Sequence, residues 1–524
     1  MMKRQYKVLG LLLALVMVCT AAAGCGAPKT ENGDTGAATS ADASATSGSS
    51  TAAASTEAAK LNPYEIKWYI DGPAPQPEIE RIEKAADELL KPINATIKIV
   101  ANDYGSYVQK IQMVIASGQE FDLCFTSNWS IPFYSTAASG AFLPLDDLLN
   151  ENAPTIMATL PKIGWQAATV NGKIYAIPNY QIWARADEIA VRKDLADKYN
   201  FDASSLKTLD QLTPFFEAVK KGEPSDMIAM GLCQNYNLWG DTKQSHGYEE
   251  IGGTLIPGVI KIDNPSCTVV NQYTTPEYQA TLDIVRDWYV KGYVKKDAST
   301  VGDLSAEMKA GKVAASPLGS WKPGGDIVAK QQFGGRDVYD VKFSDSVITG
   351  SMLIGTMAAV SKTSEDPARA IMFYDMLFKS KDLMNLITLG QENVDYKTNS
   401  DGTVSMIPNS GYDVSTFGWE FGNQFNQKLM QGQSPTVWED TIKLNNEAKI
   451  APDVGFSFDP SPIATQLASV TAVTKEYRDQ LETGSVDPKK VYPTFISKLK
   501  AAGCDQIIAE EQKQISAWKA SSGK

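Results

Sequence analysis

Hydrophobic positions in the first part of the chain follow two different periods. Residues 66–70 alternate as in a β-strand, and apolar residues recur at helical spacing over 77–90. A second strand is expected at 96–101, followed by a helix over 107–118, and the apolar run at 121–126 indicates a third, buried strand. This alternation of strands and helices predicts a parallel sheet with helices on its faces. Ligands of such sheets bind beyond the carboxyl ends of the strands.

Turn signals predict local structure farther along the chain. Asn171-Gly172 suits a two-residue turn, so residues 170–178 are expected to form a hairpin. Asp401-Gly402 predicts a second hairpin, because a calcium loop aligned on this glycine would have Lys397 at its first ligand position. Near the C-terminus, Asp487 followed by Pro488 is typical of a helix start.

The N-terminal residues have the pattern of an export signal. Residues 1–24 contain a basic start, an apolar run and small residues that lead to Cys25, as in a lipoprotein signal peptide. Cys25 would receive the lipid, although Ala22 stands where such signals usually have Leu, and an uncleaved N-terminal anchor is the alternative. Residues 25–60 are rich in Ala, Ser, Thr and Gly and have no aromatic side chain, which predicts a lipid-anchored disordered tether.

Composition narrows the possible functions. The 524 residues exceed the ~250–300 that usually share one core, so at least two lobes are expected. The formal charge of -12 leaves no basic field for nucleic acid, and His246 is the only histidine, so neither a metal site nor a cofactor is predicted. Four cysteines of the predicted folded part lack zinc or redox spacing, and a disulfide among them stays open: Cys124, Cys233, Cys267 and Cys504.

Several segments resemble one known family. They are "IASGQEFDLCFTSNW", "NGKIYAIPNYQ", "IAVRKDLADKYN", "GKVAASPLGSWKPGG" and "AAVSKTSEDPARAIMFYDMLF", in this order along the chain. Together they resemble the family 1 extracellular solute-binding proteins of carbohydrate ABC importers, from about residue 64 onward. The C-terminal stretches "GFSFDPSPIATQLASVTAVTKEYRDQLETGSVDP" and "FISKLKAAGCDQIIAEEQKQISAW" resemble Gram-positive lipoproteins of aldouronate and plant-oligosaccharide uptake.

The resemblance implies an α/β, two-lobed periplasmic-binding-protein-like (type II) fold with an interlobe hinge and cleft. The N-terminal lobe would comprise residues 61–180 and 353–408, and the C-terminal lobe residues 181–352 and 409–524. Such a protein captures an oligosaccharide and delivers it to ABC permease subunits without enzymatic chemistry. It would be a monomer, held by lipid on Cys25 at the outer face of a Gram-positive-like cell membrane.

Sugar rings have apolar C–H faces and a fringe of hydroxyl groups, so their sites need aromatic plates and polar side chains. Trp321 follows a segment that, in the family, presents a stacking tryptophan, and Trp419 matches a further aromatic of the family. The other candidates lie after predicted strands, at the lobe crossing or beside glycines. The expected ligand-binding residues are Trp321, Trp129, Trp419, Trp239, Trp183, Tyr180, Gln181, Asn128, Asp71 and Arg185.

Alternative interpretations remain at this point. A secreted glycoside hydrolase would also have many aromatic and acidic residues, although no catalytic segment is recognisable, and a glycan-binding surface adhesin would need no transporter. The charge of the ligand is equally open. Arg185 and Lys322 each follow a candidate tryptophan closely, and the likeness to aldouronate lipoproteins favours a plant-cell-wall oligosaccharide with an acidic substituent. A neutral oligosaccharide is the alternative.

Overall fold

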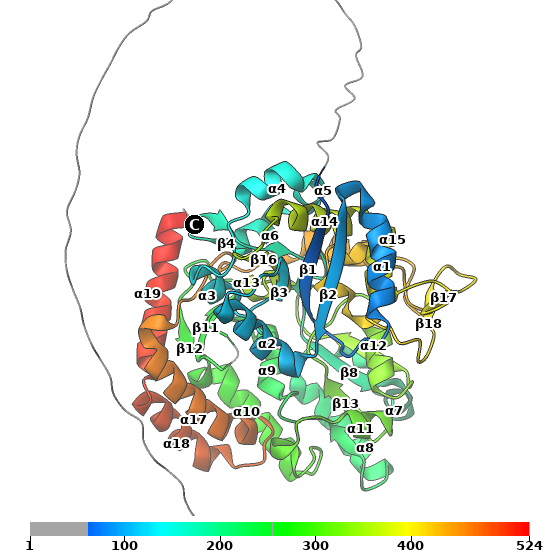
Figure 1. The fold of residues 1–524 in the computed structure, drawn as a ribbon. Helices are drawn as coiled ribbons and strands as arrows, with labels where there is room; N and C mark the ends of the chain where they lie inside the picture. The colour runs from blue at the N-terminus through cyan, green and yellow to red at the C-terminus, as the bar shows by residue number, and fades with distance from the viewer. Residues whose placement is uncertain (1–60, 254, 523–524) are drawn as a thin grey trace, which may run out of the picture. The chain divides into compact units, whose positions relative to one another are not determined.

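The computed structural model describes residues 61–253 and 255–522 (Figure 1). The signal peptide expected at 1–24, the lipidated Cys25 and the tether expected at 25–60 lie outside these ranges. The described residues form two α/β lobes, and each lobe is built around its own sheet.

The first sheet has the strand order β2-β1-β3-β16-β6. Its parallel part confirms the predicted order of strands and helices, because β1 pairs in parallel with both β2 and β3. The elements of this part are β1 (Tyr64–Asp71), α1 (Ile79–Leu90), β2 (Ala95–Asn102), α2 (Tyr104–Ser117) and β3 (Leu123–Thr126). The antiparallel strands β16 (Met357–Val360) and β6 (Ile177–Pro178) complete the sheet.

Short helices and two hairpins surround this sheet. The predicted Asn-Gly hairpin is confirmed, with Asn171 and Gly172 at φ 49° and 79° between its strands, and the Asp-Gly hairpin is confirmed as well. The surrounding elements are α3 (Phe133–Ala138), α4 (Asp146–Asn152), α5 (Pro154–Thr159), α6 (Lys162–Ala167), β4 (Thr169–Val170), β5 (Lys173–Ile174), α14 (Pro367–Lys379), α15 (Lys381–Leu389), β17 (Tyr396–Thr398), β18 (Val404–Met406) and α16 (Val437–Glu447).

The core of the first lobe is centred on Trp68. Its ring makes edge contacts with Phe373 and Phe421 at centroid distances of 5.4 and 5.2 Å. Tyr412 and Phe421 are buried in the same apolar cluster, so the segment that contains them packs with the first lobe. This packing differs from the expected boundary at residue 409, because these aromatic side chains gain more apolar contact around Trp68 than a crossing segment could offer.

The second sheet has the strand order β14-β8-β13-β9. Phe216 and Trp288 meet edge to face at 5.0 Å in the core beside it. Its strands and helices are β8 (Glu188–Arg192), α7 (Lys193–Lys198), α8 (Thr213–Gly222), β9 (Ile228–Met230), α9 (Leu238–Thr242), α10 (Pro276–Val290), α11 (Ser305–Lys309), β13 (Val313–Pro317), α12 (Gly325–Gln332) and β14 (Val338–Lys342).

The C-terminal helices extend the second lobe. The antiparallel strands β10 (Tyr248–Glu250), β11 (Gly258–Lys261) and β12 (Val270–Asn271) lie against them, and all three helices appear together in orange and red in Figure 1. The helices are α17 (Ala464–Glu482), α18 (Pro488–Ala501) and α19 (Cys504–Ser522). The predicted start of α18 is confirmed, since Asp487 accepts a hydrogen bond from the Lys489 backbone N–H.

Three chain segments run between the lobes, and they pair with one another as a small sheet. Its strand order is β19-β15-β7, with β7 (Ala184–Arg185), β15 (Val347–Ile348) and β19 (Lys449–Ile450). The short helix α13 (Gly350–Leu353) follows β15. Asn445 fixes the first crossing, because its Oδ1 accepts hydrogen bonds from the backbone N–H groups of Trp183 and Ala184 at 2.8 and 3.0 Å.

Candidate ligand-binding site

Four aromatic rings form one surface at the carboxyl ends of the first-lobe strands. Trp129 and Tyr104 are 48% and 44% exposed, although they are large apolar side chains that proteins usually bury. The Trp129 ring is 5.7 Å from Tyr104 and 6.2 Å from Trp419, and Phe417 lies 6.3 Å from Trp419. We call these four residues the aromatic platform. Two of them, Trp129 and Trp419, were predicted from the sequence.

Local structure fixes the direction of the exposed rings. Trp129 follows strand β3 in a turn in which the Ser127 hydroxyl accepts hydrogen bonds from the backbone N–H groups of Trp129 and Ser130. The indole N–H of Trp129 donates to the Gly355 carbonyl at 2.8 Å. Tyr104 begins α2, where Asp103 caps the helix by accepting from the Gly105 N–H. Both rings therefore emerge where parallel strands end.

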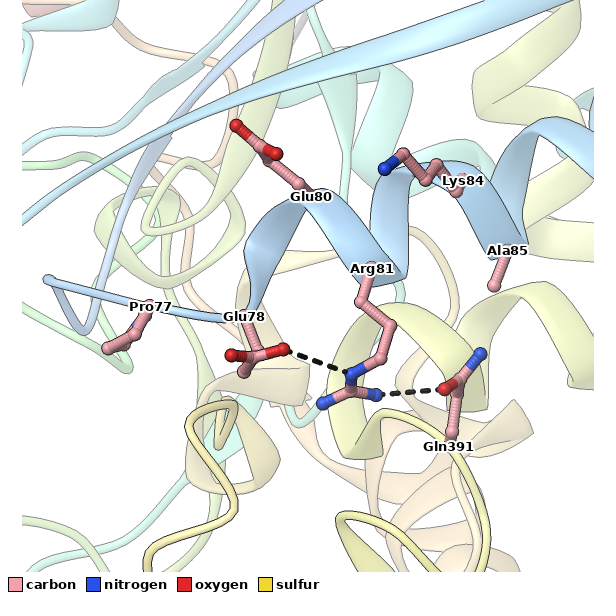
Figure 2. Close-up of a pocket in the computed structure, with 7 residues that line it drawn as sticks. All are labelled: Pro77, Glu78, Glu80, Arg81, Lys84, Ala85 and Gln391. Atoms are coloured by element: carbon pink, nitrogen blue, oxygen red, sulfur yellow. Dashed lines mark hydrogen bonds and ion pairs between the residues drawn. The ribbon is translucent and has the colours of Figure 1, made fainter.

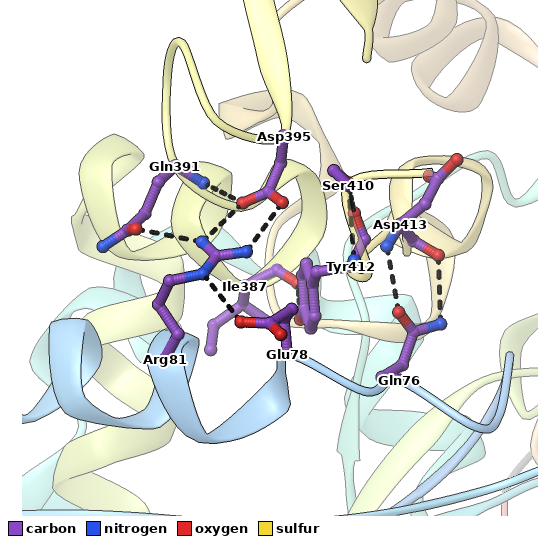
Figure 3. Close-up of polar contacts among 9 residues, drawn as sticks. All are labelled: Gln76, Glu78, Arg81, Ile387, Gln391, Asp395, Ser410, Tyr412 and Asp413. Carbon is purple, nitrogen blue, oxygen red and sulfur yellow. Dashed lines mark hydrogen bonds and ion pairs between the residues drawn. The ribbon is translucent and has the colours of Figure 1, made fainter. Parts of the chain in front are cut away.

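A polar network holds the segment that supplies Phe417 and Trp419 (Figure 3). Gln76 makes two hydrogen bonds with the backbone of Asp413, and the Tyr412 hydroxyl donates to the Ile387 carbonyl at 2.6 Å. Arg81 on α1 donates to both carboxylate oxygens of Asp395 at 2.8 and 2.9 Å, which is the bidentate geometry of a strong ion pair. The network joins α1 to the chain just before the platform.

Two buried carboxyl groups lie next to the platform. Ser130 donates its hydroxyl to Asp71 Oδ2 at 2.5 Å, and the Tyr104 hydroxyl donates to Glu420 Oε1 at 2.8 Å. The other oxygen of each carboxyl group has no hydrogen-bond partner within the described residues. Burial raises the pKa of Asp71 to about 6 and that of Glu420 well above its ordinary value. Burial thus favours the neutral form of Glu420, which can donate a hydrogen bond as well as accept one.

The second lobe contributes Trp321. This residue follows β13, and its backbone N–H donates to the Ala186 carbonyl at 2.8 Å. The ring is partly buried, and the Lys342 ammonium lies 5.0 Å from its centroid. Lys342 thus occupies part of the area that a sugar ring would cover. Among the described rings, Trp321 makes no contact with the platform, so the structure does not bring these predicted residues together.

The cations near Trp321 have carboxyl neighbours. Arg185 is exposed on β7, and the carboxyl groups of Glu249, Asp187 and Asp241 act on its charge. The carboxyl groups of Glu188 and Asp340 act in the same way on the charge of Lys322. Burial, followed by the nearby charge of Asp340, raises the pKa of Glu188 to about 9. Both cations therefore have carboxyl groups of the protein itself as neighbours.

The remaining predicted residues divide between packing and exposed positions. Trp183 and Tyr180 are buried beside the crossing at a ring distance of 5.2 Å, and the Gln181 carbonyl accepts from Asn445. Trp239 is buried too, stacked on His246, although its edge lines a small cavity in the second lobe. Asn128 is exposed in the turn before Trp129.

Sequence reasoning missed Tyr104, Phe417 and Glu420. Tyr104 could have been predicted from the sequence, because it follows the carboxyl end of β2 as Trp129 follows that of β3. Phe417 and Glu420 belong to a 3₁₀ helix at Ser415–Glu420. This helix is too short for its hydrophobic residues to repeat at a recognisable spacing in the sequence. Only contacts between distant parts of the chain bring this segment to the platform.

A cavity of about 500 Å³ lies elsewhere and opens on α1 between Glu78, Lys84 and Gln391 (Figure 2). None of its lining residues belongs to the predicted set. Within the described ranges, no group of His, Cys, Asp or Glu side chains is arranged to hold a metal ion. None of the helices in those ranges combines the length and the apolar character of a membrane span.

Comparison with known proteins assigns the fold. Residues 76–383, more than half of the chain, match the family model described as bacterial extracellular solute-binding protein. The chain belongs to this family. Residues 452–520 of this solute-binding protein, which include most of α17 to α19, match a second model described only as a domain of unknown function. The family assignment thus leaves the C-terminal helices without a role.

Relatives cover nearly the whole length of this solute-binding protein. A carbohydrate ABC transporter substrate-binding protein from Streptococcus pneumoniae serotype 4 (strain ATCC BAA-334 / TIGR4) is 23% identical over 456 residues, which are 86% of this chain and 90% of the relative. The crystal structure of the N-glycan transport solute binding protein NgtS from Streptococcus pneumoniae is 21% identical, has a TM-score of 0.77 and covers 87% of this chain and 99% of that one. NgtS in complex with Man1GlcNAc is 20% identical over the same shares, with a TM-score of 0.71.

Proposed function

We propose that this extracellular solute-binding protein captures an oligosaccharide between its lobes and delivers it to the permease subunits of an ABC importer. The observation that carries the proposal is the aromatic platform, with Trp129 and Tyr104 half exposed over two buried carboxyl groups. Flat apolar rings beside hydrogen-bonding groups match the two sides of a sugar ring. The relatives support the same class of ligand, since one is named for carbohydrate transport and another was solved with Man1GlcNAc.

The contacts favour a neutral oligosaccharide over an acidic one. Arg185 and Lys322 already have carboxyl neighbours, and the groups described at the platform are aromatic rings and the carboxyl groups of Asp71 and Glu420. A carboxylate on the ligand would find no positive partner among these platform groups. We therefore replace the acidic plant oligosaccharide favoured by sequence resemblance with a neutral oligosaccharide.

We set the boundaries of the two lobes where the chain passes from one hydrophobic core to the other. The first would comprise residues 61–183 and 349–448, and the second residues 186–346 and 451–522, with β7, β15 and β19 as the hinge. Ligand-binding residues in the first lobe would be Trp129, Trp419, Asp71 and Asn128, together with Tyr104. Trp321 and Arg185 would approach from the second lobe. Trp183, Tyr180 and Gln181 would support the hinge.

The proposal also includes a binding role without catalysis and an anchored location. The protein would be a monomer held to the outer face of the membrane by lipid on Cys25. Cys25→Ala should then release the protein into the medium, as immunoblots of cell and medium fractions would detect. Retention of the variant on the cells would argue for an uncleaved anchor instead.

Isothermal titration calorimetry with Man1GlcNAc, Man5GlcNAc and a uronic-acid oligosaccharide tests the proposed function. We expect a neutral oligosaccharide to bind with heat release and to raise the Tm, because it binds only the native state. Incubation with the same sugars should produce no new reducing ends. Tight binding of the acidic sugar alone would reject the neutral ligand, and cleavage of any sugar would reject the purely binding role.

A further inference from the structure

A second cavity lies inside the second lobe, against the C-terminal helices. Its volume is about 200 Å³, and its lining comes from the segment around α9, from strand β10, from the 3₁₀ turn Gln272–Thr274 and from helix α17. The lining residues on which the argument rests are Asn235, Trp239, Asp241, Lys243, Arg478 and Glu482. Arg478 and Glu482 belong to the segment that matches a domain of unknown function.

The cavity has polar atoms that the protein itself leaves unsatisfied. Glu482 is 1% exposed, yet its Oε1 has no hydrogen-bond partner within the described residues, and the same is true of Asp241 Oδ2. A buried acceptor without a donor is unfavourable, so such atoms usually serve a water or a ligand. Arg478 directs Nε and Nη2 towards Asp479, while Lys243 forms an ion pair with Glu250.

The cavity adjoins the second-lobe part of the proposed sugar site. Asp241 lines the cavity, and its charge also acts on Arg185, Asp187 and Glu188. The chain after α9 touches the hinge strand directly, because the Gln244 amide donates to the Arg185 carbonyl at 2.8 Å. Trp321 pairs with Ala186, the next residue along from Arg185. The cavity lining and the hinge strand are thus linked through neighbouring residues.

The chemistry of the lining selects the class of ligand. Asn, Lys and Arg side chains can donate to oxygen, and Asp241 and Glu482 can accept from hydroxyl groups. Both cations of the lining are already paired, Lys243 with Glu250 and Arg478 with Asp479, so neither is free for an anionic ligand. The volume corresponds to roughly seven waters at ~30 Å³ each, which is a small ligand. A neutral ring with several hydroxyl groups fits this size and this mixture of donors and acceptors.

We propose that the cavity is a subsite for one neutral, hydroxyl-rich sugar ring of the bound oligosaccharide, with Glu482 and Arg478 of α17 as ligand-contacting residues. This inference rests on the proposed oligosaccharide function and gives the C-terminal helices a direct part in it. Trp239 then acts as the apolar wall of the subsite rather than as an exposed plate. Its indole N–H is held by Gln272 at 2.8 Å, which fixes the ring.

A pair of matched variants tests the subsite. Glu482→Met removes both carboxyl oxygens at similar length. Glu511→Met makes the same change on α19, where another fully buried carboxyl group lacks partners but lies outside the cavity. The affinity for Man5GlcNAc, measured by calorimetry, should fall at least 10-fold for Glu482→Met and less than 2-fold for Glu511→Met. Circular dichroism and Tm verify that each variant folds.

Asn235→Leu provides an independent variant, because Asn235 is an exposed lining residue whose replacement leaves the buried core untouched. We expect it to weaken binding of Man5GlcNAc at least 5-fold. Wild-type affinity in both Glu482→Met and Asn235→Leu would overturn the proposed subsite. The cavity would then hold water only, and the proposed oligosaccharide function of the protein would be unaffected. If the wild-type protein binds neither Man5GlcNAc nor Man1GlcNAc, the subsite and the neutral-oligosaccharide function are both rejected.

Discussion

Single residues at the platform combine exposure with a fixed orientation. Trp129 is held by a backbone turn and by its own indole N–H, so little side-chain entropy is lost when a ligand stacks on it. Trp321 differs, since Lys342 lies over its ring. Both tryptophans were predicted as ligand-binding residues, but residue type alone could not rank them. Their rank depends on which neighbours cover each ring.

Replacing Trp129 with Ala should weaken oligosaccharide binding by about 1–3 kcal/mol, the loss typical of an aromatic anchor. Trp321→Ala should cost less, because part of its ring is already occupied by Lys342. Calorimetry on both variants checks the order. Met113→Ala, an exposed apolar side chain of the same lobe, should leave the affinity unchanged. A larger loss for Trp321→Ala would reverse the assignment of the main plate.

Asp71 should make stability depend on pH. Its pKa is raised to about 6 by burial, so the folded protein binds a proton more readily than the unfolded chain. The free energy of unfolding is therefore highest below pH ~4 for this group and falls as pH rises through 6. Asp71→Asn has no titrating carboxyl group at this position, so its stability relative to the wild type should rise by about 2 kcal/mol between pH 4 and pH 7.5.

Urea unfolding at several pH values measures this difference. Several titratable groups near Asp71 and Glu420 are shared by both proteins: Asp103, Tyr104, Tyr107 and Tyr374. Their own titration therefore cancels to first order in the comparison. A constant stability difference over this pH range would mean that Asp71 keeps an ordinary pKa in the folded protein.

At the scale of elements, the sequence predicts what local patterns encode. The strands and helices of the first sheet and both hairpins follow from hydrophobic period and turn residues, and α18 follows from its cap. The 3₁₀ helix at Ser415–Glu420 and the cavity wall formed by α17 could not be predicted in this way. Their places depend on contacts between residues hundreds of positions apart, such as Tyr104 with Glu420.

The network between α1 and the segment before the platform should be necessary for binding. Asp395→Ala removes a fully buried carboxylate from the Arg81 pair, and we expect a loss of about 2–4 kcal/mol in the free energy of unfolding. Hydrogen exchange in residues 410–420 should become faster, because this segment loses part of its support.

Glu78→Ala is the matched control for this change. Glu78 is the exposed partner of the same arginine at 3.4 Å, and exposed pairs contribute about 0–1 kcal/mol. Its loss should affect neither stability nor exchange beyond that amount. Equal effects of the two substitutions would show that the buried half of the network does not hold the segment.

At the scale of the molecule, the candidate ligand-binding groups are divided between two lobes. The platform belongs to the first lobe, whereas Trp321 and the small cavity belong to the second. A ligand that touches both favours the arrangement in which they approach each other. This division also explains why a deep sugar pocket need not exist within either lobe alone.

Small-angle X-ray scattering should therefore show a smaller radius of gyration with saturating Man5GlcNAc than without it. Trp129→Ala at a concentration that leaves it unliganded serves as the control and should keep the larger value. Identical scattering curves for free and fully bound wild-type protein would exclude closure of the lobes as the binding mechanism.

The three crossing strands have a consequence for how such a closure can proceed. β15 lies between β7 and β19, and backbone hydrogen bonds join each outer strand to it over two residues. Three separate linkers would let one lobe twist, slide and tilt on the other in many combinations. Strands tied edge to edge must bend together, which leaves chiefly one axis of rotation. The trajectory between open and closed forms is then narrow, and a ligand of the wrong length stops the rotation at an angle that a docking partner can distinguish.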